Sequence, residues 1–220
     1  MNSEATNLKT QIRHIGHEIR NQLSICDVYS EILKKHLIKE NIKNESINNA
    51  ISCIQNAIKL IGNNLLDLKL MGDVIIHTCD SEKLIKACIN MASVYTKGKN
   101  IQFVTNIEPE TKILVDENKF QGCIINIIKN AAESIDTEGV IKISSKQEGE
   151  FLAIKISNNG IPIPKDKIED IFKDGYTTKD TGTGTGLYLC KQNLRAMNGD
   201  IILTKTDNIT EFEIKVAILA

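Results

Sequence analysis

The sequence of 220 residues predicts an α+β protein in which a helical hairpin precedes an α/β layered domain. Two observations indicate this fold class. In the first 70 or so residues, apolar side chains recur at steps of three and four, the period of amphipathic helices. Further along, β-branched runs with strand-like alternation are interspersed with helical patterns and glycine-rich turns, which is typical of an α/β layer.

The hairpin is predicted from two apolar stripes. The first runs over residues 8–37, and the second alternates by four and three over residues 47–68 as a heptad seam. A polar, turn-like segment at residues 39–46 separates them. Because such seams leave apolar surface open on a single copy, we expect two copies to pair into a dimeric four-helix bundle.

The second part is expected to be a sandwich of helices on strands. Its boundary is expected between Gly72 and Ser81. The predicted helices cover residues 82–95, 119–135 and 185–197, and the predicted strands cover 101–107, 112–116, 140–146, 152–157, 200–206 and 211–218.

Composition excludes several classes of function. The net charge of −1 provides no basic excess for nucleic acid or anionic membranes. No apolar run approaches the roughly 20 residues of a membrane span, and the N-terminus lacks the apolar core of a signal peptide. The six cysteines show no CxxC spacing, so we expect mostly buried free thiols and a reducing, cytoplasmic setting.

The first helix carries a histidine on its polar side. His17 lies roughly 140° around the helix from Ile12 of the apolar stripe, and Asn21 follows one turn later on the same face. An exposed imidazole beside the carboxylate of Glu18 is suited to proton transfer or nucleophilic attack. Taken alone, an incidental histidine on a solvated face is the simpler explanation.

The predicted helix 119–135 carries a polar ridge opposite its apolar face. Asn126, Lys129, Asn130 and Glu133 fall within about 100° of one another around its axis. Amide oxygens can ligate magnesium and an ammonium can offset phosphate charge, so the ridge suits a nucleoside triphosphate with its metal. A solvated helix face explains the same spacing.

A glycine-rich loop precedes the last predicted helix. Gly182, Gly184 and Gly186 alternate there, and such glycines let a backbone approach phosphates at a helix N-terminus. No Lys-Ser/Thr pair follows, so the loop is not a Walker A motif.

Taken in order, these segments resemble the core of a two-component sensor histidine kinase over nearly the whole chain. GHEIRNQLS resembles a HisKA-type phosphoacceptor box, and DENKFQGCIINIIKNAAESI resembles an N box. ISNNGIPIP takes the place of the first glycine box. IFKDGYTTK resembles an F box and GTGTGLYL a second glycine box. The order and spacing of several boxes make a more specific signal than any one of them.

The resemblance implies a dimerisation and histidine phosphotransfer domain in residues 1–72 and an ATP-binding domain of the histidine-kinase/gyrase type in residues 73–220. His17 is then the acceptor of the γ-phosphoryl group, Glu18 the base, and Asn21 the residue that positions water when phospho-aspartate is hydrolysed. The implied partner is the receiver domain of a response regulator. The implied ligands are ATP and Mg²⁺, with Asn130 on the metal and the following nucleotide-binding residues: Asn126, Lys129, Asn130, Asn158, Gly160, Thr177, Thr178, Lys179, Gly182, Gly184, Thr185, Gly186 and Leu187.

Four positions depart from the family pattern. Asn158 stands where the family has the aspartate that accepts a hydrogen bond from the adenine amino group, and Pro162 and Tyr188 replace glycines. Gln22 replaces the usual proline after the phosphoacceptor. Asn158 keeps one carbonyl acceptor, so we expect ATP affinity to be weakened about tenfold by the loss of a charge-assisted bond.

The favoured function is therefore a histidine kinase that phosphorylates His17 from ATP and passes the phosphoryl group to a response regulator, possible phosphatase activity included. An ATP-independent histidine phosphotransferase is the first alternative, and a non-catalytic dimeric scaffold is the second. ATPases that use a glutamate base for water fit poorly, because Asn126 stands at that position.

Overall fold

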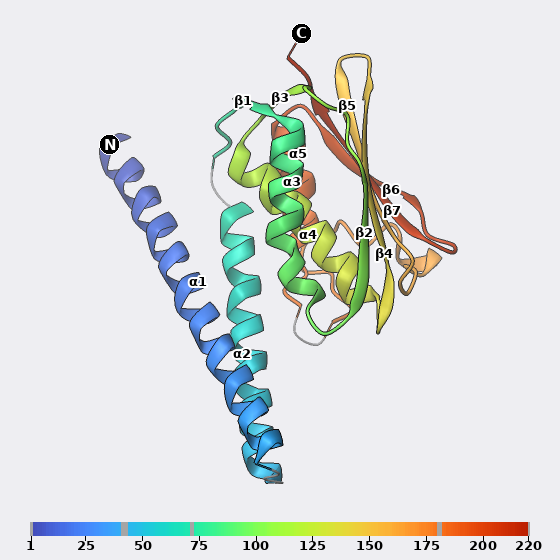
Figure 1. Cartoon of the computed structure of the whole chain (residues 1–220). Coiled ribbons are helices and arrows are strands. Elements are labelled where there is room, and N and C mark those ends of the chain that lie inside the picture. The colour runs from blue at the N-terminus through green and yellow to red at the C-terminus, as the bar shows by residue number, and fades with distance from the viewer. Residues whose placement is uncertain (1, 41–43, 71–72, 180–181, 220) are drawn as a thin grey trace. The chain divides into compact units, whose positions relative to one another are not determined.

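The computed structural model describes residues 2–40, 44–70, 73–179 and 182–219 (Figure 1). The chain divides into two compact units. One comprises Met1–Lys69 with Lys179–Gly182, and the other comprises Leu70–Thr178 with Thr183–Ala220. The functions assigned above to residues 1–72 and 73–220 remain predictions.

Two long helices form most of the first unit. They are α1 (Asn2–Lys39) and α2 (Glu45–Leu70), and each helix extends beyond both ends of its predicted apolar stripe. The side-chain oxygen of Asn44 accepts a hydrogen bond from the backbone N–H of Ile47 at 3.2 Å, which satisfies one of the open donors at the start of α2. Figure 1 shows α2 returning beside the end of α1 to which it is connected.

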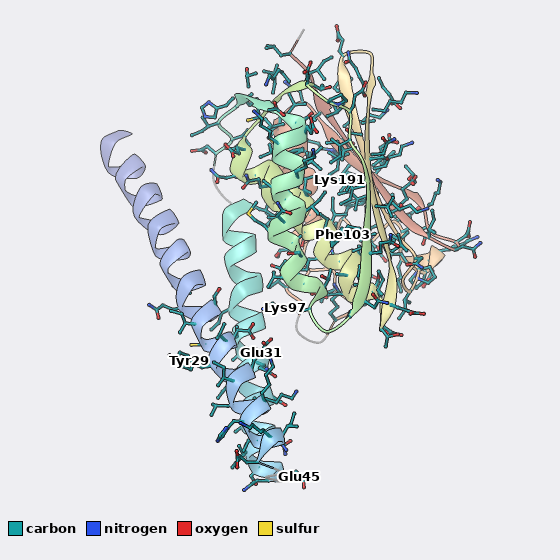
Figure 2. The ribbon with its side chains drawn as sticks, in the orientation of Figure 1. Tyr29, Glu31, Glu45, Lys97, Phe103 and Lys191 are labelled. Carbon is teal, nitrogen blue, oxygen red and sulfur yellow. The ribbon has the colours of Figure 1, made fainter. Side chains whose placement is uncertain are left out.

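Large apolar side chains stay exposed along this hairpin. Ser30 and Ile51 are buried near the connection, whereas Tyr29, labelled in Figure 2, is 63% exposed. Other exposed apolar residues of the hairpin are Ile19, Ile25, Val28, Ile32, Leu33, Ile38, Ile47, Ile54 and Ile61. Where exposed apolar side chains of this kind form a contiguous patch, the patch usually marks an interface. The four-helix bundle remains a prediction.

The second unit is built on a five-stranded sheet in the order β2-β4-β5-β7-β6. These strands are β2 (Asn100–Asn106), β4 (Glu138–Glu148), β5 (Phe151–Asn158), β6 (Asp200–Lys205) and β7 (Thr210–Ala217). β2 pairs with β4 in parallel, and the remaining pairs are antiparallel. A separate antiparallel pair joins β1 (His77–Asp80) to β3 (Lys112–Val115).

Three helices cover one face of this sheet (Figure 1). They are α3 (Ser81–Ala92), α4 (Glu117–Ser134) and α5 (Gly186–Ala196). Two short 3-10 helices, η1 (Ser93–Thr96) and η2 (Lys165–Lys167), complete the unit. Its α+β arrangement agrees with the predicted layered domain.

Alternation along the strands explains the core. Every second residue of the central strands points to the helices and is buried: Ile141 and Ile143 on β4, Leu152, Ile154 and Ile156 on β5, and Phe212, Ile214 and Val216 on β7. Each such side chain contributes about 1.5–3 kcal/mol through burial. From the opposite layer, α4 buries Phe120, Ile124, Ile127 and Ile128. The core therefore fixes the rotation of α4, and with it the direction of its polar ridge.

Several predicted details were wrong. β1 was not predicted, because four residues without apolar alternation carry no strand signal. The helix predicted over 119–135 begins two residues earlier, where Asp116 accepts a hydrogen bond from the N–H of Lys119, and ends at Ser134 because Ile135 is extended. The cysteines were expected to be mostly buried, but Cys26 and Cys53 are exposed and Cys79 is partly so.

Among the described residues, no helix combines the length and apolar character needed to cross a membrane.

Candidate nucleotide-binding site

The polar ridge of α4 begins at a buried amide. Asn126 is only 4% exposed, and its Nδ2 lies 3.6 Å from the sulfur of Cys190 on α5. The first residue of α5, Gly186, packs against it so closely that a Cβ would lie 2.8 Å from both Nδ2 and Oδ1 of Asn126. The start of α5 therefore fixes the Asn126 side chain, and a solvated helix face is no longer a sufficient explanation for this residue.

The rest of the ridge is more open. Lys129 and Asn130 are half-buried one turn further along α4, and Glu133 is exposed. The Lys129 ammonium lies 3.9 Å from a carboxylate oxygen of Glu133, within ion-pair range. The ridge thus presents an amide, an ammonium and a second amide in one row, a donor set that fits a Mg²⁺-phosphate group.

Buried thiols fill the space behind this row. Cys123 of α4 and Cys190 of α5 are buried and pack against each other, each sulfur lying within 4.0 Å of the other residue's carbonyl oxygen. Burial raises the pKa of the Cys123 thiol well above its ordinary value, so the thiol stays neutral. The helices α4 and α5 therefore meet at a close, uncharged contact directly beside Asn126.

The turn after β5 attaches to the end of α4. Asn158 is 5% exposed, and its Nδ2 donates to the hydroxyl oxygen of Ser134 at 2.8 Å. The backbone N–H of Ile161 donates to the carbonyl of Ser134, also at 2.8 Å. Gly160 passes so close that a Cβ would lie 2.5 Å from that same carbonyl oxygen. The proline at position 162 is exposed and leaves these three contacts intact.

A hydroxyl on the neighbouring strand lies on the same face of the sheet as Asn158. Thr210 of β7 is paired directly with Asn158 of β5, so the two side chains lie on the same face of the sheet. Within the described part of the chain, the Thr210 hydroxyl is buried without a hydrogen-bond partner. Such a group costs about 1–3 kcal/mol unless a ligand or water satisfies it.

The glycine-rich loop is held by its backbone. Gly184 has a φ of 72°, and a Cβ there would lie 2.3 Å from the carbonyl carbon of Gly175. Next to it, the hydroxyls of Thr183 and Thr185 lie 2.9 Å apart. Thr185 precedes α5 without a side-chain cap, so the first N–H groups of α5, including that of Leu187, are open to an anion.

The preceding F-box segment is anchored from two sides. The ring of Phe172 packs edge-on against Phe212 of β7, with centroids 6.3 Å apart. The ammonium of Lys191, labelled on α5 in Figure 2, lies 4.4 Å from the centre of the Phe172 ring. The residues that follow, Thr177, Thr178 and Lys179, are exposed. Gly182 donates its N–H to the carbonyl of Lys179 at 3.1 Å.

Not every predicted residue can be placed. α1 contains His17, Glu18 and Asn21, but their side chains lie outside what the structure describes. Tyr188 is half-buried on α5. An open cavity of about 460 Å³ lies elsewhere, between η2 and the β6–β7 turn, and none of the predicted nucleotide-binding residues lines it.

The structure adds two residues to the predicted set. Ser134 and Thr210 were not singled out from the sequence, although both adjoin Asn158. Ser134 is the last residue of α4, and a polar residue at the C-terminal end of the N-box helix was the available signal. Thr210 gave none, because its importance comes from strand register.

Comparison with known proteins agrees with this geometry. Residues 115–218 match the family model "Histidine kinase-, DNA gyrase B-, and HSP90-like ATPase". Sporulation kinase C of Bacillus subtilis (strain 168) is 27% identical over 189 residues, which are 85% of this chain and 43% of that protein. These matches support a histidine-kinase-type ATPase domain in residues 115–218. The whole chain spans less than half the length of that curated relative.

Solved structures also resemble the ATPase domain. The catalytic domain of histidine kinase ThkA is 26% identical with a TM-score of 0.60, over 65% of this chain and 95% of that one. The complex of ThkA with response regulator protein TrrA has a TM-score of 0.66 at 23% identity, over 99% of this chain and 64% of the ThkA chain. At that identity the second match shows the fold alone. The α+β fold of the ATPase domain is therefore that of histidine kinase catalytic domains.

Proposed function

We propose that this chain is an ATP-dependent protein-histidine kinase that phosphorylates its own His17 and transfers the phosphoryl group to an aspartate of a response-regulator receiver domain. The observation that carries the proposal is the row Asn126, Lys129 and Asn130 beside the open N-terminus of α5. A domain that had lost ATP would have no need to keep these groups together.

The phosphate end of the site supplies charge neutralisation. Lys129 is placed on the same helix face as the two amides and can bond a phosphate oxygen. Backbone N–H groups at the start of α5 bind phosphate through the helix dipole. Mg²⁺ bound through the side-chain oxygen of Asn130 would neutralise the charge that develops on the β- and γ-phosphates.

The adenine end reads the base through Asn158. Its carbonyl oxygen is the acceptor for the adenine amino group, and the unpaired hydroxyl of Thr210 lies beside it on the neighbouring strand. A ligand or a bound water that satisfies this hydroxyl would remove the cost of its burial.

The transfer itself is an in-line displacement. A ring nitrogen of His17 forms the new N–P bond while the bond from the γ-phosphorus to the bridging oxygen breaks and ADP leaves. Glu18 takes the ring proton, and the resulting phosphohistidine donates its phosphoryl group to the aspartate of the regulator. Asn21 positions water for hydrolysis of phospho-aspartate.

Two observations support the proposed partner and assembly. The ThkA structure that shares this fold was determined in complex with response regulator protein TrrA, which supports a receiver domain as the partner. The exposed apolar residues of α1 and α2 support a homodimer, because pairing would bury them.

The deciding experiment is incubation of the pure chain with γ-labelled ATP and Mg²⁺. We expect acid-labile, base-stable label on the wild type and on His14→Gln, and none on His17→Gln. His14 is the matched control because it lies on the same polar side of the first helix without an adjacent acid. Absence of label on the wild type at millimolar ATP would rule out the proposed kinase activity.

A histidine phosphotransferase is the second candidate, favoured by Asn158 in place of the family's aspartate. It predicts that label reaches His17 from a phosphorylated receiver domain in the absence of ATP. If neither donor labels His17, a non-catalytic scaffold is the remaining function.

A further inference from the structure

Ser134 contacts the base-reading turn through both its side chain and its backbone. Its hydroxyl donates to the carbonyl of Ala131 at 2.8 Å and accepts from Nδ2 of Asn158 at 2.8 Å. Its own carbonyl accepts from the N–H of Ile161. Ser134 is the last residue of α4, so it joins the N-box helix to the end of β5.

The side-chain contact determines which way the Asn158 amide faces. A hydroxyl has one hydrogen, and in Ser134 that hydrogen is used by the carbonyl of Ala131. Toward Asn158 the hydroxyl is therefore an acceptor, and only the NH₂ end of the amide can donate to it. The oxygen of Asn158 must face the other way, and no group among the described residues donates to that oxygen.

This orientation matters because an amide can read two kinds of purine. With its oxygen toward the base, Asn158 accepts from the 6-amino group of adenine. With its nitrogen toward the base, it donates to the 6-oxo group of guanine. A carboxylate has two equivalent acceptors, so it reads adenine in either orientation.

We infer that Ser134 is the residue that sets base specificity in this nucleotide site, because it locks Asn158 as an acceptor and so selects adenine over guanine. The inference rests on the proposed nucleotide-binding function. Ser134 is a positioning residue that acts through Asn158. A carboxylate at position 158 would need no partner to orient it, whereas the amide of Asn158 is oriented by Ser134.

Replacing Ser134 by alanine isolates this role. The variant loses the hydroxyl but keeps the backbone carbonyl that holds Ile161, so the turn stays attached. The amide of Asn158 is then free to rotate. Turning the amide in the wild type would break the chain of hydrogen bonds through Ser134, and one such bond corresponds to about fivefold in an equilibrium constant.

The test measures binding of ADP and GDP, each with Mg²⁺, to the full chain by isothermal titration. We expect the wild type to prefer ADP, and Ser134→Ala to lower the ratio of ADP to GDP affinity by about fivefold or more. Ser134→Ala combined with Asn158→Asp should restore the preference, because a carboxylate cannot turn a donor toward the base.

Ser93→Ala is the matched control. The Ser93 hydroxyl donates to the carbonyl of Asn90 at 2.7 Å, the same kind of bond at the end of α3, and it has no part in the site. We expect this variant to keep the wild-type ratio.

The outcomes separate the two hypotheses. Equal weakening of ADP and GDP in Ser134→Ala would mean a merely structural role and would overturn the inference while leaving the nucleotide site standing. An unchanged ratio, or failure of the double variant to restore it, would also overturn it. Absence of ADP binding by the wild type and by Asn158→Asp alike would remove the proposed function itself.

Discussion

Gly186 lies against Asn126 so closely that a Cβ at position 186 would come within 2.8 Å of both terminal atoms of the amide. The contact links the second glycine box to the N box through van der Waals packing. It also explains why the first residue of α5 carries no side chain.

Gly186→Ala tests whether this packing holds Asn126 in place for a ligand. The added methyl group must displace the amide, so we expect ADP affinity in the presence of Mg²⁺ to fall about tenfold through lost charge-assisted bonds. Gly62→Ala is the control, because a Cβ at Gly62 of α2 meets nothing within 4 Å. Equal ADP affinities in the two variants would show that Asn126 does not need this position.

Gly184 provides a second test, on the loop. Its φ of 72° is unfavourable for a side chain, and a Cβ would lie 2.3 Å from backbone carbon of Gly175. We expect Gly184→Ala to detach the loop from the Gly175 turn and to accelerate tryptic cleavage after Lys173 and Lys179.

Gly175→Ala is the comparison for this prediction. Gly175 has a similar φ of 75°, but a Cβ there meets nothing within 4 Å. It therefore carries the backbone strain of about 1–2 kcal/mol without the collision. Cleavage that is no faster in Gly184→Ala than in Gly175→Ala would contradict a role for the close contact.

Lys119 concerns stability rather than binding. Lys119 is 3% exposed, and its ammonium donates a hydrogen bond to the carbonyl of Leu70 at 2.9 Å. The side chain of Asn193 donates to the same oxygen at 2.7 Å. We expect Lys119→Met to lower the free energy of unfolding by about 1.5–3 kcal/mol, the range for hydrogen bonds to charged groups. Urea unfolding followed by circular dichroism measures it.

A double-mutant cycle with Asn193→Ala extends this test. Because the two donors share one acceptor, we expect the effects to be non-additive by about 0.5 kcal/mol or more. Lys86→Met, at an exposed ion pair on α3, should change the free energy of unfolding by less than about 1 kcal/mol. Lys119→Met that is as mild as Lys86→Met would refute the structural role of this bond.

Asp80 links folding to pH. The N–H of Lys83 and then the ammonium of Lys112 lower the pKa of its carboxyl group. A lowered pKa in the folded state means that the stabilisation is complete above the unfolded value of about 3.9 and is lost as pH falls through the folded value. Asp80→Asn keeps a capping oxygen but cannot titrate.

We therefore expect the difference in unfolding free energy between wild type and Asp80→Asn to be constant above about pH 5 and to shrink below about pH 4. Urea titrations at several pH values measure it. Two stability curves that stay parallel through this range would rule out the linkage.

How far the sequence predicted these features depends on the range of the interaction. Periodicity placed α4 and its polar ridge within two residues, because the apolar face of a helix is a local property. It did not predict that Asn126 is buried, since burial there comes from Gly186, 60 residues away along the chain by residue number. The direction of a side chain was predictable, but its neighbour was not.

Asn158 shows the same limit of prediction from sequence. The sequence indicated that an amide stands where the family has a carboxylate, and suggested that one acceptor survives. Which end of the amide faces the base depends on Ser134, which lies on a different element and is joined to it only by the fold. Strand register likewise brought Thr210 opposite Asn158.

The hydrogen bonds at Leu70 have a consequence for protein engineering. Leu70 is the last residue of α2, yet its carbonyl is the acceptor for two buried donors of the second unit, Lys119 and Asn193. A chimera joined between Leu70 and β1 would exchange that peptide for one from another parent and put both donors at risk. A fusion point at least one turn earlier in α2 would keep the Leu70 carbonyl with the unit whose donors bind it. Exchangeable modules in this chain are therefore best joined inside a helix.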